Sequence, residues 1–174
     1  NVDGTVNVVK AAIAAGVERV LVISSDKACQ PVTFYGYTKA LAEAFAVRAN
    51  ARGFIRDRTA KDRAPNGTAV SCARWGNVLN SRGAALHLFR QRIAEGRPIP
   101  ITDLRCTRFF LTMAQAVNAA LRALDDLRGG EILVPCLPAG RLVDLVEAVG
   151  GAGYPMEVIG MRPGGEKLHE ALVG

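Results

Sequence analysis

The sequence predicts an α/β protein built around a parallel sheet. Residues 20–23 form a continuous aliphatic run of strand length, the pattern of a parallel strand that is buried on both faces. Segments with apolar residues at helical spacing alternate with such runs, as in sheets built with right-handed crossovers. Polar residues follow the first two predicted strands directly, and ligands of α/β sheets bind beyond the carboxyl ends of the strands.

Helices and strands are expected to alternate along most of the chain. We predict helices over residues 1–16, about 36–52, 83–95, 113–127 and 141–149, and strands over residues 19–24, 68–75 and 130–135. Gly16 closes the first helix, and a charged loop over residues 53–67 ends in a turn. Residues 98–101 form a short extended piece, and residues 103–110 mix cations with aromatic side chains.

The composition indicates a globular protein. With 174 residues, 49% of them hydrophobic, the chain is long and apolar enough to bury a core. No apolar run approaches the roughly 18 residues that span a bilayer, and no secretion signal opens the chain. We therefore expect a cytoplasmic protein with no membrane insertion in this segment.

The net charge and the spacing of cysteines and histidines indicate which partners, disulfides and metal sites to expect. The formal net charge of +6 is compatible with nucleic acid, a membrane surface or an anionic small substrate. Most arginines are scattered rather than interleaved with aromatic residues, which favours a phosphate-bearing small substrate over nucleic acid. Cys29, Cys72, Cys106 and Cys136 are widely spaced, so reduced thiols that mostly pack are expected. The two histidines show no close ligand spacing, and no metal site is expected.

The stretch richest in chemistry follows the first predicted strand. Ser24, Ser25, Asp26 and Lys27 leave the carboxyl end of that strand. They are either placed to meet a substrate or form an ordinary solvated exit from the strand. These four residues alone leave both alternatives open.

Tyr35 and Lys39 favour the substrate site. A spacing of four residues places both side chains on one face of a helix, about one turn apart. An ammonium group near a phenol favours the phenolate, which makes Tyr35 a usable proton acceptor or donor. Such pairs also arise by chance on helices, but the strand and the polar cluster just ahead make chance the weaker explanation.

Seven short motifs follow one another along nearly the whole chain. They are Ile-Ser-Ser-Asp-Lys-Ala at 23–28, Tyr-Gly-Tyr-Thr-Lys at 35–39, Arg-Trp-Gly-Asn-Val at 74–78, Ser-Arg-Gly at 81–83, Ile-Thr-Asp at 101–103, Thr-Arg-Phe-Phe at 107–110 and Arg-Pro-Gly-Gly-Glu-Lys-Leu-His-Glu at 162–170. The order resembles that of the extended short-chain dehydrogenases/reductases. More narrowly, it resembles the inverting UDP-N-acetylglucosamine 4,6-dehydratases of polysaccharide biosynthesis.

The resemblance implies the carboxyl-terminal part of a doubly wound, Rossmann-like parallel sheet with a small substrate-binding lobe. Residues 1–80 would form the carboxyl-terminal half of the NAD(P)-binding domain. Residues 81–174 would form mainly the substrate-binding lobe, with 113–136 returning to the sheet. No glycine-rich G-x-x-G-x-x-G turn occurs, so the first βα units of the family are expected to be missing.

By the same resemblance, five residues carry the chemistry. Tyr35 with Lys39 moves the C4 hydroxyl proton, and Ser25 hydrogen-bonds that hydroxyl. Asp26 protonates the leaving C6 oxygen, and Lys27 removes the C5 proton. NADP is the implied cofactor, although NAD also suits the motif. Ser24, Tyr35 and Lys39 are expected to contact it.

The resemblance also implies a UDP-sugar substrate. Asn77 and Arg82 are its expected ligands, and Arg108 and Arg162 are expected at its diphosphate, since a guanidinium matches phosphate oxygens bidentately. The structural alternatives are a turn asparagine for Asn77, a salt bridge for Arg82, and a helix cap for Arg162. Beside Arg108, Phe109 and Phe110 are alternatively plain core residues. No nucleic-acid partner is expected, and a homo-oligomer is compatible with the motifs.

The chain departs from the family pattern at three places. Ser25 stands where threonine is usual, Asn80 replaces a usual glycine, and Gly164 and Gly165 stand where one glycine is usual. Family members with a tyrosine at the position of Tyr35, rather than methionine, mostly invert C5. We therefore expect an inverted 4-keto-6-deoxy sugar, for surface polysaccharide or flagellin glycans.

Two other functions remain open from the sequence. A UDP-sugar 4-epimerase shares Tyr35 and Lys39 but does not need Asp26 and Lys27 as an elimination pair. A truncated, non-catalytic nucleotide-sugar-binding remnant is the alternative outside enzymes, and the residues given are expected to be inactive on their own.

Overall fold

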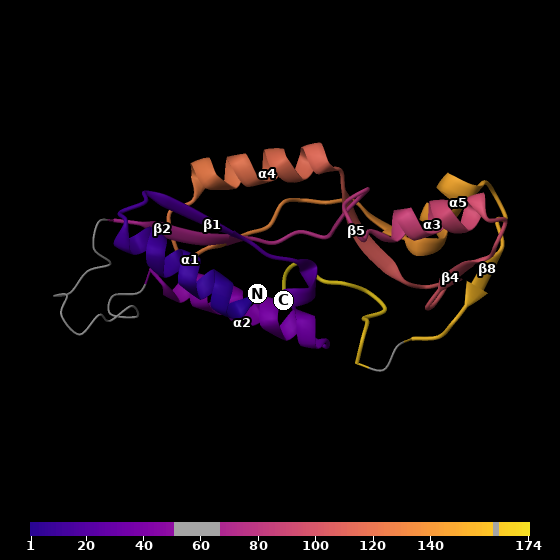
Figure 1. Cartoon of the computed structure of the whole chain (residues 1–174), viewed down its shortest axis with the longest axis horizontal. Helices are drawn as coiled ribbons and strands as arrows, with labels where there is room; N and C mark the ends of the chain where they lie inside the picture. Colours follow the sequence, from indigo (N-terminus) through magenta and orange to yellow (C-terminus); the bar gives the residue numbers. More distant parts are fainter. Residues whose placement is uncertain (51–66, 162–163) are drawn as a thin grey trace.

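The structure, a computed structural model, describes residues 1–50, 67–161 and 164–174. The described helices are α1 (Val2–Ala14), η1 (Asp26–Ala28, a 3-10 turn), α2 (Phe34–Arg48), α3 (Ala85–Ala94), α4 (Met113–Asp126) and α5 (Leu142–Gly150). The strands are β1 (Arg19–Ile23), β2 (Ala69–Ala73), β3 (Asn77–Val78), β4 (Ile99–Ile101), β5 (Thr107–Leu111), β6 (Ile132–Leu133), β7 (Ala139–Arg141) and β8 (Met156–Val158). Figure 1 shows an elongated molecule with two groups of elements along its long axis.

The first group, here called the sheet part, consists of α1, β1, η1, α2, β2, α4 and β6. Its three strands pair in parallel in the order β1-β2-β6. Helices α1 and α2 lie on one face of this sheet and α4 lies on the other (Figure 1). The sequence therefore predicted the α/β class and the parallel sheet correctly.

Alternation along the strands explains the two layers of helices. Val70 and Cys72 of β2 pack with Val9 and Ile13 of α1 on one face of the sheet. Ala73 lies in a second cluster with the α4 side. Because both faces are covered, the strands are apolar nearly throughout, which is the pattern that identified them in the sequence.

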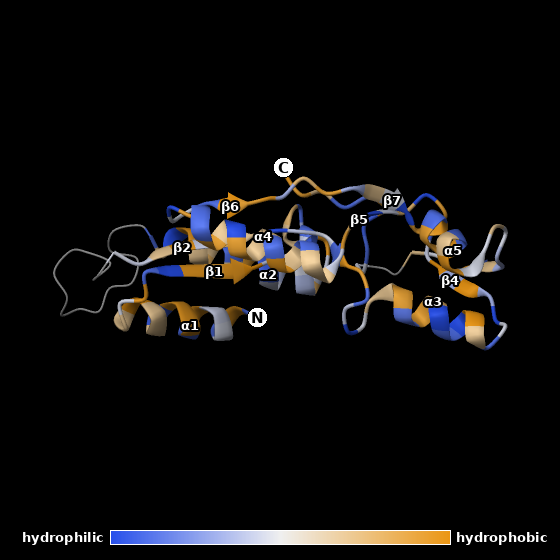
Figure 2. Ribbon diagram, turned by 90° about the horizontal axis from the view of Figure 1, so that it is seen from above, coloured by the Kyte–Doolittle hydropathy of each residue, from blue (hydrophilic) through white to orange (hydrophobic). Residues whose placement is uncertain are grey.

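The second group, here called the distal part, consists of α3, β4, α5 and β8. Strands β4 and β8 pair in parallel, and Phe89, Ile99, Ile101 and Val146 form its core. A third sheet, in the order β3-β5-β7, joins the two parts. Figure 2 shows hydrophilic and hydrophobic residues interleaved along α3, as expected for a helix with one covered face.

The sequence missed four of the strands that the structure describes. Strands β3, β5, β7 and β8 were left without an assignment, and three of them have only two or three residues. Phe109 and Phe110 lie in β5, which pairs with β3 and β7, so the segment that mixes cations with aromatic side chains is a strand. Most of the predicted loop over residues 53–67 and the last residues of the predicted second helix lie outside the described residues.

The C-terminal segment, residues 164–174, runs back from the distal part to the sheet part (Figure 1). It forms a parallel bridge between His169 and Thr107 of β5. At its end, the carbonyl of Leu172 accepts a hydrogen bond from Arg74 Nη1 at 2.7 Å. Residues far apart in the sequence are thus brought to the junction between the two parts.

Candidate active site

A cleft of about 620 Å³ lies at the junction of the sheet part, the distal part and the C-terminal segment. This volume is within the range of roughly 300–1,000 Å³ that is usual for small-molecule sites. Five of the predicted site residues border the cleft: Lys27, Tyr35, Asn77, Arg82 and Arg108. The structure therefore brings together side chains from η1, α2, β3, the loop after β3, and β5.

The remaining predicted residues do not line this cleft. Ser24 and Ser25 follow β1, Asp26 begins η1, and Lys39 lies on α2. Arg162 lies outside the described residues.

Lys27 and Asp26 form an ion pair at the wall of the cleft. Lys27 Nζ lies 3.0 Å from Asp26 Oδ1, and Ser25 Oγ donates to the same oxygen at 2.9 Å. The Asp26 side chain is fully buried, whereas the Lys27 side chain is 33% exposed. Lys27 is therefore the member of the pair that lines the cleft, whereas Asp26 does not.

Local backbone structure explains why these three residues converge. Strand β1 ends at Ile23, and Asp26 N–H then donates to the carbonyl of Trp75 at 2.9 Å, which fixes the exit from the sheet. Ser25 caps the η1 turn, its Oγ accepting from Lys27 N at 3.3 Å. The Ser25 hydroxyl needed for this cap is retained where the family usually has threonine.

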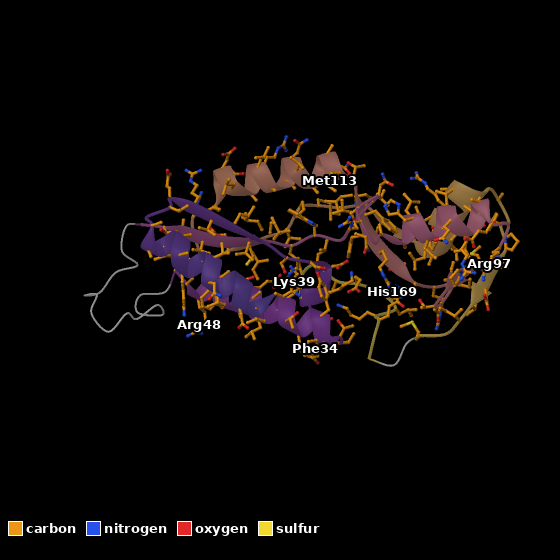
Figure 3. The ribbon with its side chains drawn as sticks, in the orientation of Figure 1. Phe34, Lys39, Arg48, Arg97, Met113 and His169 are labelled. Carbon is orange, nitrogen blue, oxygen red and sulfur yellow. The ribbon has the colours of Figure 1, made fainter. Side chains whose placement is uncertain are left out.

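Tyr35 and Lys39 lie on the first turns of α2, as the spacing predicted. Thr33 caps the helix by accepting from Gly36 N at 2.9 Å, so Tyr35 stands at the helix start and borders the cleft. Lys39 Nζ donates to the carbonyl of Ile23 at 3.1 Å, at the end of β1. Figure 3 shows Lys39 on the part of α2 that faces the sheet.

A close approach between α2 and η1 requires glycine at residue 36. A Cβ atom on Gly36 would lie 2.4 Å from the backbone oxygen of Lys27, a distance that real Cβ contacts do not show. Glycine allows the helix carrying Tyr35 to pack directly on the turn carrying Lys27.

Asn77 and Arg82 lie on the opposite wall. Asn77 Nδ2 lies 3.5 Å from the carbonyl of Phe109, the outer limit of a hydrogen bond, while Arg82 is exposed. Between them, Asn80 has φ +62°, a left-handed conformation that favours glycine and that asparagine tolerates better than most residues. Asn80 therefore keeps the backbone conformation for which the family usually has glycine.

Arg108 is buried and anchored from three directions. Its Nη1 donates to the carbonyls of Thr107 and Leu168 at 2.7 and 3.1 Å, and its Nη2 pairs with Glu166. The guanidinium borders the cleft and is held in one orientation. Sequence reasoning did not anticipate the salt bridge of Arg108, and it gave a salt bridge as the alternative only for Arg82.

Sequence reasoning missed the acidic and basic residues of the C-terminal segment. Glu166, Lys167 and Glu170 all border the cleft. Their motif was noted, but its extra glycine left their placement undecided. Gly164 adopts φ +61°, so one of the paired glycines serves a left-handed turn.

A buried ion pair joins α2 to the end of β2, and sequence reasoning also missed it. Arg74 at the end of β2 donates to Glu43 of α2 through Nε and Nη2 at 3.0 and 2.6 Å. The hydrogen bond with Glu43 raises the pKa of Arg74. Glu43 lies eight residues after Tyr35 and four after Lys39, so a helical spacing of four was the signal for it.

Two buried polar atoms just beyond the carboxyl end of β1 are available to hydrogen-bond a ligand. Ser24 Oγ and Asp26 Oδ2 are buried and have no hydrogen-bond partner among the described residues. Buried polar atoms without partners are costly unless a ligand or water satisfies them. Together with the exposed Tyr35 side chain, they fit the nicotinamide and ribose end of a dinucleotide.

Curated relatives include two enzymes of sugar nucleotides. The chain is 36% identical over 174 residues to the UDP-N-acetylglucosamine 4,6-dehydratase (inverting) of Campylobacter jejuni, covering 99% of this chain and 48% of that protein. It is 37% identical over 176 residues to the UDP-glucose 4-epimerase of Rickettsia canadensis, again covering 99% and 48%. The chain thus spans about half the length of these relatives.

Solved structures share the fold. Pen from Bacillus thuringiensis matches with a TM-score of 0.85 and 35% identity, over 100% of this chain and 53% of that one. DesIV, a dTDP-glucose 4,6-dehydratase from Streptomyces venezuelae solved with NAD bound, matches with a TM-score of 0.80 and 21% identity, over 100% and 57%. The second likeness shows the fold alone.

These likenesses place the fold among the Rossmann-type dehydratases and epimerases of sugar nucleotides. The chain belongs to the polysaccharide biosynthesis protein family, whose model matches residues 1–174. Within residues 1–50, 67–161 and 164–174, no helix combines the length and the apolar character that crossing a membrane requires.

Proposed function

We propose that this chain provides the substrate cleft and catalytic side chains of an NADP-dependent UDP-N-acetylglucosamine 4,6-dehydratase that inverts C5. The observation that carries the proposal is the position of Lys27 and Tyr35 on one cleft, with the Asp26 carboxylate bonded to Lys27. Epimerisation at C4 needs only a proton carrier for the C4 hydroxyl. Elimination across C5 and C6 needs an additional acid and base, which Asp26 and Lys27 supply.

The first step is oxidation at C4, because the C5 proton becomes acidic only next to a ketone. Tyr35 takes the proton of the C4 hydroxyl, and Lys39 stays beside the end of β1 through Ile23 O. Ser25 is proposed to hydrogen-bond the same hydroxyl. A nicotinamide cofactor held by Ser24, Tyr35 and Lys39 would supply the hydride chemistry at C4 and C6.

Elimination then removes water across C5 and C6. Lys27 as the free amine takes the C5 proton while the protonated Asp26 gives its proton to the leaving C6 oxygen. This leaves Lys27 as an ammonium and Asp26 as a carboxylate, the charges of the ion pair between them. A proton from solvent then adds to C5 from the opposite face while the hydride adds to C6. Transfer of the Lys27 proton to Asp26, and of the Tyr35 proton to solvent, restores the starting forms. Because Asp26 is fully buried, its donation requires the carboxyl group to turn toward the cleft or the proton to pass through Lys27.

Ser24, Tyr35 and Lys39 are proposed to hold the nicotinamide end of NADP, and NAD would suit the same three residues. The unpartnered Ser24 Oγ supports this assignment. Arg108 and Arg162 are proposed to bind the diphosphate, with Asn77 and Arg82 as further ligands of the UDP-sugar.

The proposal is tested with the natural polypeptide that contains these residues, NADP and UDP-N-acetylglucosamine in D₂O. We expect a 4-keto-6-deoxy product with deuterium at an inverted C5, detected by mass and NMR. Lys27→Ala should abolish the exchange at C5 and leave oxidation at C4 intact. The matched control is Lys10→Ala, an exposed lysine on α1.

A UDP-sugar 4-epimerase is the second candidate, and the Rickettsia canadensis relative favours it. Its signature would be a C4 epimer with no loss of water and no dependence on Lys27. A dehydrated product with C5 retained would exclude the inversion alone. A non-catalytic nucleotide-sugar-binding role would give UDP-sugar binding without any turnover.

A further inference from the structure

Lys167 of the C-terminal segment is a buried cation with two partners. Its Nζ donates to the carbonyl of Cys29 at 2.7 Å and forms an ion pair with Glu170 Oε2 at 2.7 Å, a contact that lacks hydrogen-bond geometry. The side chains of Lys167 and Glu170 are only 13% and 3% exposed. Burying such a pair removes both charges from water, so the pair by itself is weak evidence for a role in stability.

The carbonyl that Lys167 binds belongs to the residue that closes the η1 turn. Cys29 N–H donates to the carbonyl of Asp26 at 3.1 Å, so Cys29 and Asp26 are joined across the turn that carries Lys27. A hydrogen bond from an ammonium to this carbonyl therefore fixes the C-terminal side of the turn.

The other side of the same turn rests against α2. Gly36 approaches so closely that a Cβ atom there would lie 2.4 Å from Lys27 O. The turn is thus held between the first turn of α2 and the ammonium of Lys167. Since Asp26 N–H is also bonded to Trp75 O, the backbone of the turn is fixed by three separate elements.

We propose that Lys167 is a positioning residue for the Asp26 and Lys27 pair, and that Glu170 keeps its ammonium aimed at Cys29. This inference rests on the proposed function, because it assigns to Lys167 the orientation of the elimination pair. Lys167 acts through the backbone of η1 and does not exchange a proton with the sugar. Its effect should fall on the elimination and not on substrate binding.

The first test measures backbone hydrogen exchange over residues 24–30 in the natural polypeptide, and it needs no turnover. In Lys167→Met we expect amide exchange of this peptide to become about tenfold faster or more, because a charge-assisted hydrogen bond to the turn is lost. Lys10→Met is the matched control, and Lys167→Arg should restore most of the protection because it keeps a donor and the charge. Unchanged exchange in Lys167→Met would overturn the proposal.

Should Lys167→Met not fold, Glu170→Gln provides the same measurement. This variant keeps a hydrogen-bonding group of the same shape and removes only the charge beside Lys167. We expect the amides of residues 24–30 to exchange faster in Glu170→Gln than in the control variant Lys10→Met. Protection equal to that of the unmodified protein would contradict the assignment of Glu170.

The second test separates positioning from substrate contact, since Lys167 also borders the cleft. Positioning predicts that Lys167→Met lowers kcat for C5 deuterium exchange at least about tenfold while KM for the UDP-sugar changes less than about twofold. A raised KM with unchanged kcat would mean direct substrate binding and would overturn the proposal. If the unmodified protein oxidises C4 without dehydration, the proposed function fails, and the exchange measurement still decides whether Lys167 holds the turn.

Discussion

Breaking the buried ion pair between Glu43 and Arg74 should destabilise the protein more than breaking any exposed pair. The two side chains are 4% and 12% exposed, and the guanidinium makes two hydrogen bonds to the carboxylate. A third bond ties Arg74 Nη1 to Leu172 O at the end of the C-terminal segment. Glu43→Gln keeps the shape of the side chain and leaves the Arg74 charge without its counter-ion.

The expected magnitude follows from the burial of both partners. Removing one partner of a buried pair leaves an uncompensated charge and costs about 3–5 kcal/mol. Single domains are stable by about 5–15 kcal/mol, so this loss is a large fraction of the total. Arg74→Lys should also be costly, because an ammonium cannot reproduce the two parallel hydrogen bonds of the guanidinium.

Urea unfolding measures this effect through the fluorescence of Trp75. It is the only tryptophan of the chain, adjoins Arg74 in sequence, and is 7% exposed. The matched control is Glu95→Gln, which removes the partner of Arg97 in an exposed ion pair. We expect the urea concentration at the unfolding midpoint to fall strongly in Glu43→Gln and to change little in Glu95→Gln. Equal midpoints for the two variants would refute the reasoning.

Three further predictions use single positions. Gly36→Ala should lower the free energy of unfolding by about 1–3 kcal/mol, measured by thermal unfolding, because the new methyl group has no room. Its control is Gly4→Ala, where nothing lies within 4 Å of the new atom, and this variant should be neutral or slightly more stable. Burial raises the pKa of the Cys72 thiol to about 12, so iodoacetamide should label the exposed Cys136 in the native protein and Cys72 only after unfolding. A hydrogen bond from the neighbouring arginine lowers the pKa of Asp103 from 3.8 to about 2, so a carboxyl NMR titration should have its midpoint near 2. The stabilisation by ionised Asp103 should be present above 3.8 and disappear as the pH falls through about 2.

The sequence predicted those elements whose pattern is local. Strand β1 shows an unbroken aliphatic run, and α4 shows apolar residues at helical spacing. The capping box of Thr112 and Gln115 at the start of α4 is a finding of the structure. Strands β3, β7 and β8 have two or three residues and exist only because a distant segment pairs with them. A pattern of that length carries no periodicity, so sequence reasoning could not find them.

The residues of the candidate site likewise fall into those that the local sequence pattern predicted and those that it did not. Lys27 and Tyr35 could be placed because each stands at the end of an element that the sequence marks clearly. The wall formed by Glu166 and Lys167 could not, because their positions depend on contacts with Arg108 and Cys29, 58 and 138 residues away. The roles of all these residues in catalysis stay predictions.

The burial of Asp26 does not by itself decide between dehydratase and epimerase. A carboxylate at 0% exposure is held there only if its partners compensate the loss of water, and Ser25 and Lys27 supply one hydrogen bond each to the same oxygen. The second oxygen has no partner among residues 1–50, 67–161 and 164–174, which is an energetic cost that packing alone does not require. An unpartnered buried oxygen can accept a hydrogen bond from a bound group, and the site described above assigns that place to the nicotinamide and ribose end of a dinucleotide. Both a dehydratase and an epimerase bind a dinucleotide, so this oxygen does not distinguish them, and the choice rests on whether Lys27→Ala abolishes exchange at C5.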